Sequence, residues 1–120
     1  MEILTLKPGD SHWQSVVDFR ENCHWIVDQI NERKHIQQVL IAAIEDSKVL
    51  GFCGFTQASD ASPDAMALAT LYIDESARGR GIAGQLMTEA QAYAKVHHIT
   101  QVATPGAVKA IFEKYGFSVI

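Results

Sequence analysis

The sequence predicts an α/β fold (α+β in some schemes), because strand-like and helix-like segments alternate along the chain. Between residues 39 and 56, two apolar runs rich in β-branched and aromatic residues flank a short polar turn, as in a hairpin. Apolar residues recur every three to four positions from Ile82 to Ala94, as in an amphipathic helix. Over residues 67–94 a strand-like run, a glycine-rich turn and that helix follow in order. This alternation favours a sheet covered by helices.

The first third of the chain predicts a strand and a helical region. Glu2–Leu6 alternates well enough for a strand, and the turn-forming Pro8–Ser11 that follows supplies an N-cap. Apolar residues then recur at helical spacing from Trp13 to Ile30, with a polar interruption at Arg20–Asn22. One bent helix and two short helices both fit this pattern.

The middle of the chain predicts a hairpin followed by a loop. Val39–Ile44 and Val49–Thr56 read as its two strands, and Glu45–Lys48 as its turn, with Glu45 and Asp46 as turn residues. The small polar residues of Gln57–Asp64 predict a mobile surface loop before the next strand.

The last third predicts two strands and two helices. Ala67–Ile73 and Ile99–Thr104 have strand character, and the helix beginning at Ile82 lies between them. A final helix over residues 107–115 carries an apolar stripe that should face the core. Gly116 stands where a helix C-terminus favours a left-handed residue.

Composition narrows the class of protein. We expect a single domain over residues 1–120, because this length supports one hydrophobic core. A net charge of −4 argues against nucleic acid as a partner. No apolar run could span a bilayer, and the amino terminus lacks a signal-peptide pattern, which predicts no membrane partner and a cytoplasmic location. Cys23 and Cys53 have neither zinc-site nor disulfide spacing, so we expect two buried thiols and no metal.

The glycine-rich turn is the strongest functional signal. Glycines between a strand and a helix let the backbone approach a ligand, and the helix N-terminus presents unpaired N–H groups to negative charge. Arg78 and Arg80 lie in this turn. They reinforce a preference for phosphate and predict a positive patch on an acidic protein. We therefore expect an anion site formed by Arg78, Gly79, Arg80, Gly81, Ile82, Ala83 and Gly84.

Three phosphate-binding patterns compete for this segment. A dinucleotide fold needs a carboxylate at the end of the next strand, and Ile99–Thr104 has none. A P-loop needs a lysine and a hydroxyl that are missing here. Arg78-x-x-Gly81-x-Ala83 matches the remaining pattern, a pyrophosphate loop, and in it the sequence closely resembles the GNAT superfamily of acyl-CoA-dependent N-acyltransferases.

The resemblance extends from about residue 36 to residue 117. Besides the loop, it includes the hairpin with a glycine early in its second strand and the last helix with the closing Gly116-Phe117. It implies a mixed, mostly antiparallel sheet flanked by helices. The family continues with two further strands where this chain has only Phe117–Ile120, so the C-terminal end is expected to be shortened.

The resemblance also implies acetyl-CoA as the co-substrate, without a metal. In the family the fourth strand parts from the fifth, and its freed backbone groups hold the pantetheine arm and polarise the thioester carbonyl. By position, Leu71 and Ile73 supply these groups, and residues 78–84 hold the pyrophosphate.

Catalytic side chains are less clearly indicated. Many members carry a general-acid tyrosine on the last helix, where this sequence has Phe112. Tyr115 lies one turn later on the same stripe and is a candidate, but this stripe should face the core, which favours a packing role for Tyr115. Asp74 and Glu75 follow the strand beside the cofactor turn and are candidates for drawing a proton from the amine through water.

Two functions remain open on these grounds. The first is an N-acetyltransferase in which an amine attacks acetyl-CoA directly in a ternary complex, with a small-molecule or peptide amine as acceptor. The alternative is a catalytically weakened acyl-CoA-binding domain that acts as a sensor or interaction module.

The fifth strand should lie at or near a sheet edge, which predicts a homodimer.

Overall fold

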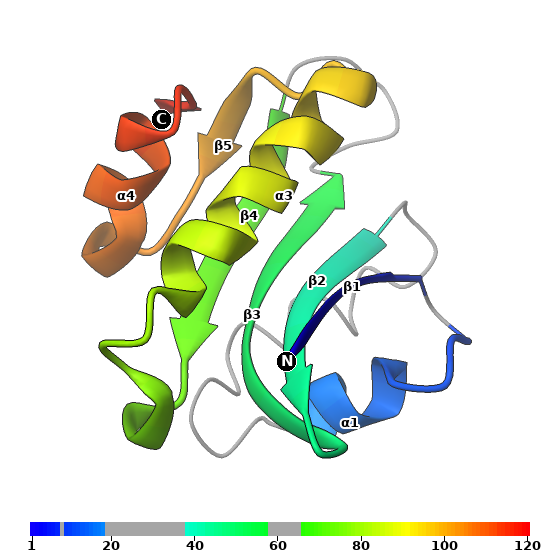
Figure 1. Ribbon diagram of the computed structural model, residues 1–120. Coiled ribbons are helices and arrows are strands. Elements are labelled where there is room, and N and C mark those ends of the chain that lie inside the picture. Colours follow the sequence, from blue (N-terminus) through cyan, green and yellow to red (C-terminus); the bar gives the residue numbers. More distant parts are fainter. Residues whose placement is uncertain (8, 19–37, 58–65) are drawn as a thin grey trace.

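The computed structural model describes residues 1–7, 9–18, 38–57 and 66–120 and shows a six-stranded sheet (Figure 1). The strands lie in sequence order: β1 (Glu2–Leu6), β2 (Gln38–Glu45), β3 (Lys48–Gln57), β4 (Met66–Ile73), β5 (Gln101–Ala103) and β6 (Ser118–Val119). Strands β1 to β4 pair antiparallel, whereas β4, β5 and β6 pair parallel. The predicted mixed, mostly antiparallel sheet is confirmed.

Helices cover both faces of this sheet. The long α3 (Ile82–Val96) and the short α4 (Lys109–Lys114) pack on one face, and α1 (Trp13–Asp18) packs on the other. Two 3₁₀ turns, η2 (Glu75–Ala77) and η3 (Gly106–Val108), precede α3 and α4. The predicted helical residues 19–30, together with Cys23 and most of the predicted loop 57–64, lie outside the described residues.

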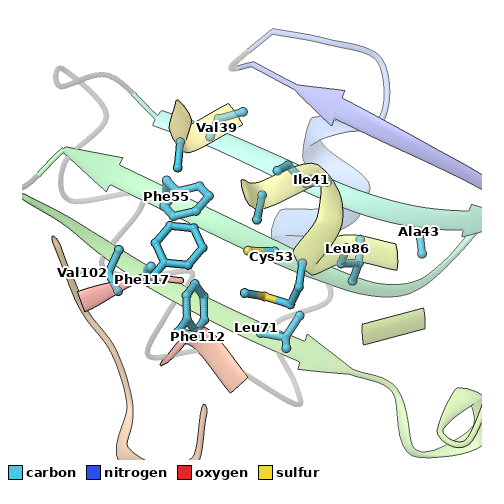
Figure 2. Close-up of a cluster of buried hydrophobic side chains, with 14 of the residues drawn as sticks. Val39, Ile41, Ala43, Cys53, Phe55, Leu71, Leu86, Val102, Phe112 and Phe117 are labelled. Atoms are coloured by element: carbon cyan, nitrogen blue, oxygen red, sulfur yellow. The ribbon is translucent and has the colours of Figure 1, made fainter. Parts of the chain in front are cut away.

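The larger core lies between the sheet and the α3–α4 layer. Figure 2 shows three phenylalanines at its centre, where Phe112 of α4 meets Phe55 edge-on at 6.4 Å and Phe117 at 5.3 Å between ring centroids. Phe112 is fully buried, so the predicted apolar stripe of the last helix does face the core. Cys53 is also fully buried, as predicted, and burial raises the pKa of its thiol.

Local sequence signals account for the element ends. Asp46 and Ser47 have φ values of 50° and 64°, which is the two-residue turn that matches the twist of a hairpin. At the end of α4, Gly116 has φ 91° and donates its N–H to the Glu113 carbonyl, while the Phe117 N–H bonds the Phe112 carbonyl. This is the Schellman arrangement, and it confirms the predicted role of Gly116.

Two element boundaries differ from the sequence-based expectation. The fifth strand is shorter than the predicted 99–104, because β5 pairs with β4 over three residues only. The last helix begins as η3, where the Val108 N–H donates to the carbonyl of the N-cap Pro105, and becomes α-helical at Lys109.

Gly51 permits the close pairing of β3 with the end of β4. A Cβ atom at this position would lie 2.7 Å from Ile73 Cδ1 and 2.8 Å from the Tyr72 carbonyl oxygen. We expect Gly51→Ala to lower the free energy of unfolding by about 1–3 kcal/mol, the usual penalty of overpacking. Urea denaturation would measure this change.

The matched control is Gly106→Ala, because a Cβ atom there would meet nothing within 4 Å. It should leave stability unchanged or slightly raised. Equal effects of the two substitutions would contradict this account of how the end of β4 is positioned.

Candidate active site

Strand β4 is paired differently along its two sides. Seven residue pairs join it to β3, from Gly51 opposite Ile73 to Gln57 opposite Ala67. Only three pairs join it to β5, and the last of them is Leu68 opposite Ala103. Beyond Leu68 the two parallel strands therefore separate, and the second half of β4 has a free side.

Backbone alternation shows which groups of β4 face this opening. The Asp74 N–H donates to the Leu50 carbonyl at 2.8 Å, so the backbone groups of Asp74 point toward β3. Because direction alternates along a strand, the backbone groups of Leu71 and Ile73 point the other way, into the opening. The Leu71 side chain at the same time packs in the core. The backbone groups of both predicted residues therefore face the opening.

The turn after β4 leads directly to the N-terminus of α3. Gly79 and Gly81 have φ values of 84° and 76°, in the left-handed region that glycine enters without strain. Gly81 is the N-cap of α3 and supplies no capping side chain. The N–H groups of the next three residues, Ile82, Ala83 and Gly84, therefore lack a helical partner and are available to an anion.

The two arginines of this turn already have partners within the chain. Arg78 Nε donates to the Ile73 carbonyl at 3.1 Å, and its guanidinium lies 5.8 Å from the centre of the Tyr72 ring. An Nη atom of Arg80 lies 3.1 Å and 3.2 Å from the two carboxylate oxygens of Glu45. The expected positive patch is thus weakened at Arg80, whose charge is offset by Glu45.

Glu45 is a residue whose contact the sequence did not reveal. The sequence predicts Glu45 only as a turn residue of the hairpin. In the structure it is the last residue of β2, and its carboxylate accepts a hydrogen bond from Arg80, which lies 35 residues later in the sequence. The Arg80 guanidinium, through its hydrogen bond and its charge, lowers the pKa of the Glu45 carboxyl. No local pattern encodes this pair, because it depends on where the α3 turn lies relative to the hairpin.

Asp74 and Glu75 lie directly after β4, before the glycine-rich turn, as predicted. Asp74 caps η2: its carboxylate accepts hydrogen bonds from the Ser76 hydroxyl and from the Ser76 N–H, the latter at 3.1 Å. The Ser76 hydroxyl is the main cause that lowers the pKa of Asp74. This carboxylate therefore has a structural role and is a weak base, while Glu75 is exposed.

Tyr115 is the residue after α4 and is half-buried against the core, as the packing interpretation expects. Its backbone carbonyl accepts a hydrogen bond of 2.8 Å from Gln91 of α3. Its hydroxyl lies only 3.1 Å from where a Cβ atom of Gly84 would stand. Gly84 thus lets the Tyr115 hydroxyl contact the first turn of α3.

Other kinds of site find no support in the part of the chain that the structure describes. Its His, Cys, Asp and Glu residues form no group of three or more that could hold a metal ion. None of its helices is both long enough and apolar enough to cross a membrane.

Comparison with known families matches residues 35–119 to the Acetyltransferase (GNAT) domain. The match covers more than half of the sequence, so the chain belongs to this family. A comparison with curated proteins gives no significant match.

Solved structures of acetyltransferases share the fold. One is a probable acetyltransferase with 20% identity and a TM-score of 0.65, covering 98% of this chain and 89% of the other. A predicted acetyltransferase from Clostridium acetobutylicum, solved with acetyl-CoA, has 15% identity and a TM-score of 0.68. The match covers 98% of this chain and 90% of that protein. The aminoglycoside N-acetyltransferase AAC(6′)-Iy, solved with CoA, has 15% identity and a TM-score of 0.65. The match covers 98% of this chain and 87% of that protein.

The first test of the anion site is Gly81→Asn. Asparagine tolerates the left-handed backbone of this position, and its side chain adds bulk beside the three free N–H groups. We expect the variant to fold but to lose the increase in melting temperature that saturating acetyl-CoA gives the wild type.

Gly9→Asn is the matched control, because Gly9 also has a positive φ, 97°, and open space around it, but lies before α1. Its response to acetyl-CoA should equal that of the wild type. An undiminished response in Gly81→Asn would show that the cofactor binds elsewhere.

The second test concerns the competition for Arg80. Removing the charge of Glu45 with Glu45→Gln should free Arg80 for the phosphates and strengthen CoA binding by about two- to fivefold at low salt, the scale of an exposed ion pair. Calorimetric titration would measure this change, which should shrink at high salt.

Glu113→Gln changes the net charge equally, on an exposed residue of α4, and should leave the affinity unaltered. Weaker binding by Glu45→Gln would mean that Glu45 orients Arg80 for the cofactor rather than competing with it.

Proposed function

We propose that this chain is a single-domain N-acetyltransferase, spanning residues 1–120, that transfers the acetyl group of acetyl-CoA to an amine. The observation that carries the proposal is the half-paired β4, whose open edge ends at the uncapped N-terminus of α3. The chain belongs to the GNAT family, which supports acetyl transfer as the reaction at this place.

In this proposal backbone groups hold the co-substrate. The N–H groups of Ile82, Ala83 and Gly84 bind the pyrophosphate, assisted by the α3 dipole. Leu71 and Ile73 offer backbone bonds to the pantetheine arm along β4. The Ile73 carbonyl already accepts a hydrogen bond from Arg78 Nε. The Ile73 N–H and the N–H and carbonyl of Leu71 are therefore the groups proposed to bind the pantetheine arm.

The chemistry follows from polarisation and positioning. An N–H of β4 donates to the thioester carbonyl oxygen, which stabilises the negative charge that develops when the amine attacks. The C–N bond forms, the C–S bond breaks, and the proton that the nitrogen loses ends on the CoA sulfur. Positioning alone can supply a large share of such an acceleration, so direct attack does not require a side-chain acid.

The alternative is an acyl-CoA-binding domain with weakened transfer. It is favoured by Phe112, which stands fully buried and without a hydroxyl where many family members carry their general acid. Such a domain would bind acetyl-CoA at the same loop and release no thiol when amines are added.

The acceptor is proposed only as a class, a small-molecule or peptide amine. An aminoglycoside acetyltransferase is among the similar structures, but its likeness at 15% identity reaches no further than the fold. We also propose a cytoplasmic location.

A homodimer stays a prediction. It is suggested by the short edge strand β6 and by the exposed Ile120 beside it, and light scattering would test it.

Thiol release from acetyl-CoA in the presence of spermidine, kanamycin or an alanine-terminated peptide tests the enzyme against the binding domain. We expect turnover with at least one amine. Tyr115→Phe should retain more than about one tenth of the maximal rate, because Tyr115 serves packing rather than proton transfer. The melting temperature of the variant serves as its folding control.

A fall of more than about 100-fold in a folded Tyr115→Phe variant would identify Tyr115 as the general acid. Acetyl-CoA binding without turnover on any amine would instead favour the binding domain.

A further inference from the structure

The side chain of Tyr115 runs along α3 from its middle to its first turn. Gln91 Nε2 donates to the Tyr115 carbonyl oxygen at 2.8 Å, which fixes the end of α4 against the middle of α3. The Tyr115 hydroxyl lies 3.1 Å from the place where a Cβ atom of Gly84 would stand, about two helical turns before Gln91. Packing against the core accounts for the ring of Tyr115, but it does not account for the hydroxyl at the tip.

Gly84 differs from the two other glycines of this turn. Gly79 and Gly81 have positive φ values, whereas Gly84 does not, so its backbone conformation suits any residue. Glycine is also less favourable within a helix than alanine. What favours glycine here is space, because a Cβ atom would stand closer to the Tyr115 hydroxyl than an ordinary van der Waals contact. Gly84 therefore admits the hydroxyl to the first turn of α3.

The Tyr115 hydroxyl is available to a ligand. Within the part of the chain that the structure describes, no residue forms a hydrogen bond with it. Among the same residues, the buried side-chain oxygen that lacks a partner is Thr70 Oγ1, so the unpaired Tyr115 hydroxyl is in contact with solvent. A ligand can thus accept a hydrogen bond from it without breaking one inside the protein.

This hydroxyl lies at the edge of the proposed anion site. The Gln85 N–H donates to the Gly81 carbonyl, so the Gly84 N–H is the last of the three donors without a helical partner. The Gly84 nitrogen and the Cβ position beside the hydroxyl are bonded to the same Cα atom, so the N–H and the hydroxyl lie close together. An anion that binds this N–H can therefore accept a second hydrogen bond from Tyr115.

We propose that the Tyr115 hydroxyl donates a hydrogen bond to the pyrophosphate of CoA, so that the end of α4 completes the anion site at the N-terminus of α3. The inference rests on the proposed function and adds a cofactor-binding side chain to its backbone donors. This role differs from that of a general acid, because the phenol keeps its proton throughout.

Tyr115→Phe tests the inference, because it removes the hydroxyl and keeps the ring. In calorimetric titration we expect its Kd for CoA to be about tenfold higher than that of the wild type, the effect of one hydrogen bond to a charged group. Dephospho-CoA, which lacks the 3′-phosphate and retains the pyrophosphate, should show the same ratio. In the thiol-release assay, KM for acetyl-CoA should rise about tenfold while kcat changes less than about threefold.

Tyr93→Phe is the matched control. It removes a phenolic hydroxyl from the other half of α3, where the Tyr93 ring stacks on Phe55 and on His97. This variant should bind CoA as tightly as the wild type.

An unchanged Kd in a folded Tyr115→Phe variant, or an equal loss of affinity in Tyr93→Phe, would overturn the inference. A loss seen with CoA and absent with dephospho-CoA would place the hydroxyl at the 3′-phosphate and overturn the pyrophosphate contact. A lower kcat with an unchanged Kd would make Tyr115 a general acid and overturn it as well.

The same titrations separate the inference from the proposed function. A wild type that binds CoA but releases no thiol with any amine would end the proposed function, while a tenfold ratio in Tyr115→Phe would still support the inference. If the wild type does not bind CoA, both fail.

Discussion

The unequal pairing of β4 is the constraint on which the rest of this structure depends. Seven pairs with β3 fix its position and twist, while three pairs with β5 leave its second half open on one side. In a sheet, unpaired backbone groups ordinarily seek another strand. Here they lie beside a helix N-terminus that also lacks partners, so the polar groups of two elements meet at one place.

If the proposed function holds, this arrangement lets a small acidic chain bind an anionic co-substrate. The groups proposed to face the anion are backbone N–H groups and a helix dipole, whose effect does not depend on net charge. The arginines of the turn have structural contacts instead: Arg78 bonds the end of β4, and Arg80 bonds Glu45. They shape the turn as well as adding charge to it.

Much of the fold was predictable because the signals are local. The hairpin turn at Asp46–Ser47, the helix beginning after Gly81 and its buried stripe, and the left-handed Gly116 each follow from a few neighbouring residues. The pairing of Glu45 with Arg80 was not predictable, because it joins segments whose relative placement emerges only when the sheet closes. The contact of the Tyr115 hydroxyl with the first turn of α3 likewise depends on how α4 packs against α3.

The central claim is that backbone groups of β4 and of the α3 N-terminus receive acetyl-CoA. Titration of ¹⁵N-labelled protein with CoA, followed by amide chemical shifts, tests it most directly because each N–H reports separately. The account predicts the largest, saturable changes at residues 81–84 and at Leu71 and Ile73, with small changes along β1. Saturable changes confined to other segments, or none at all, would contradict it.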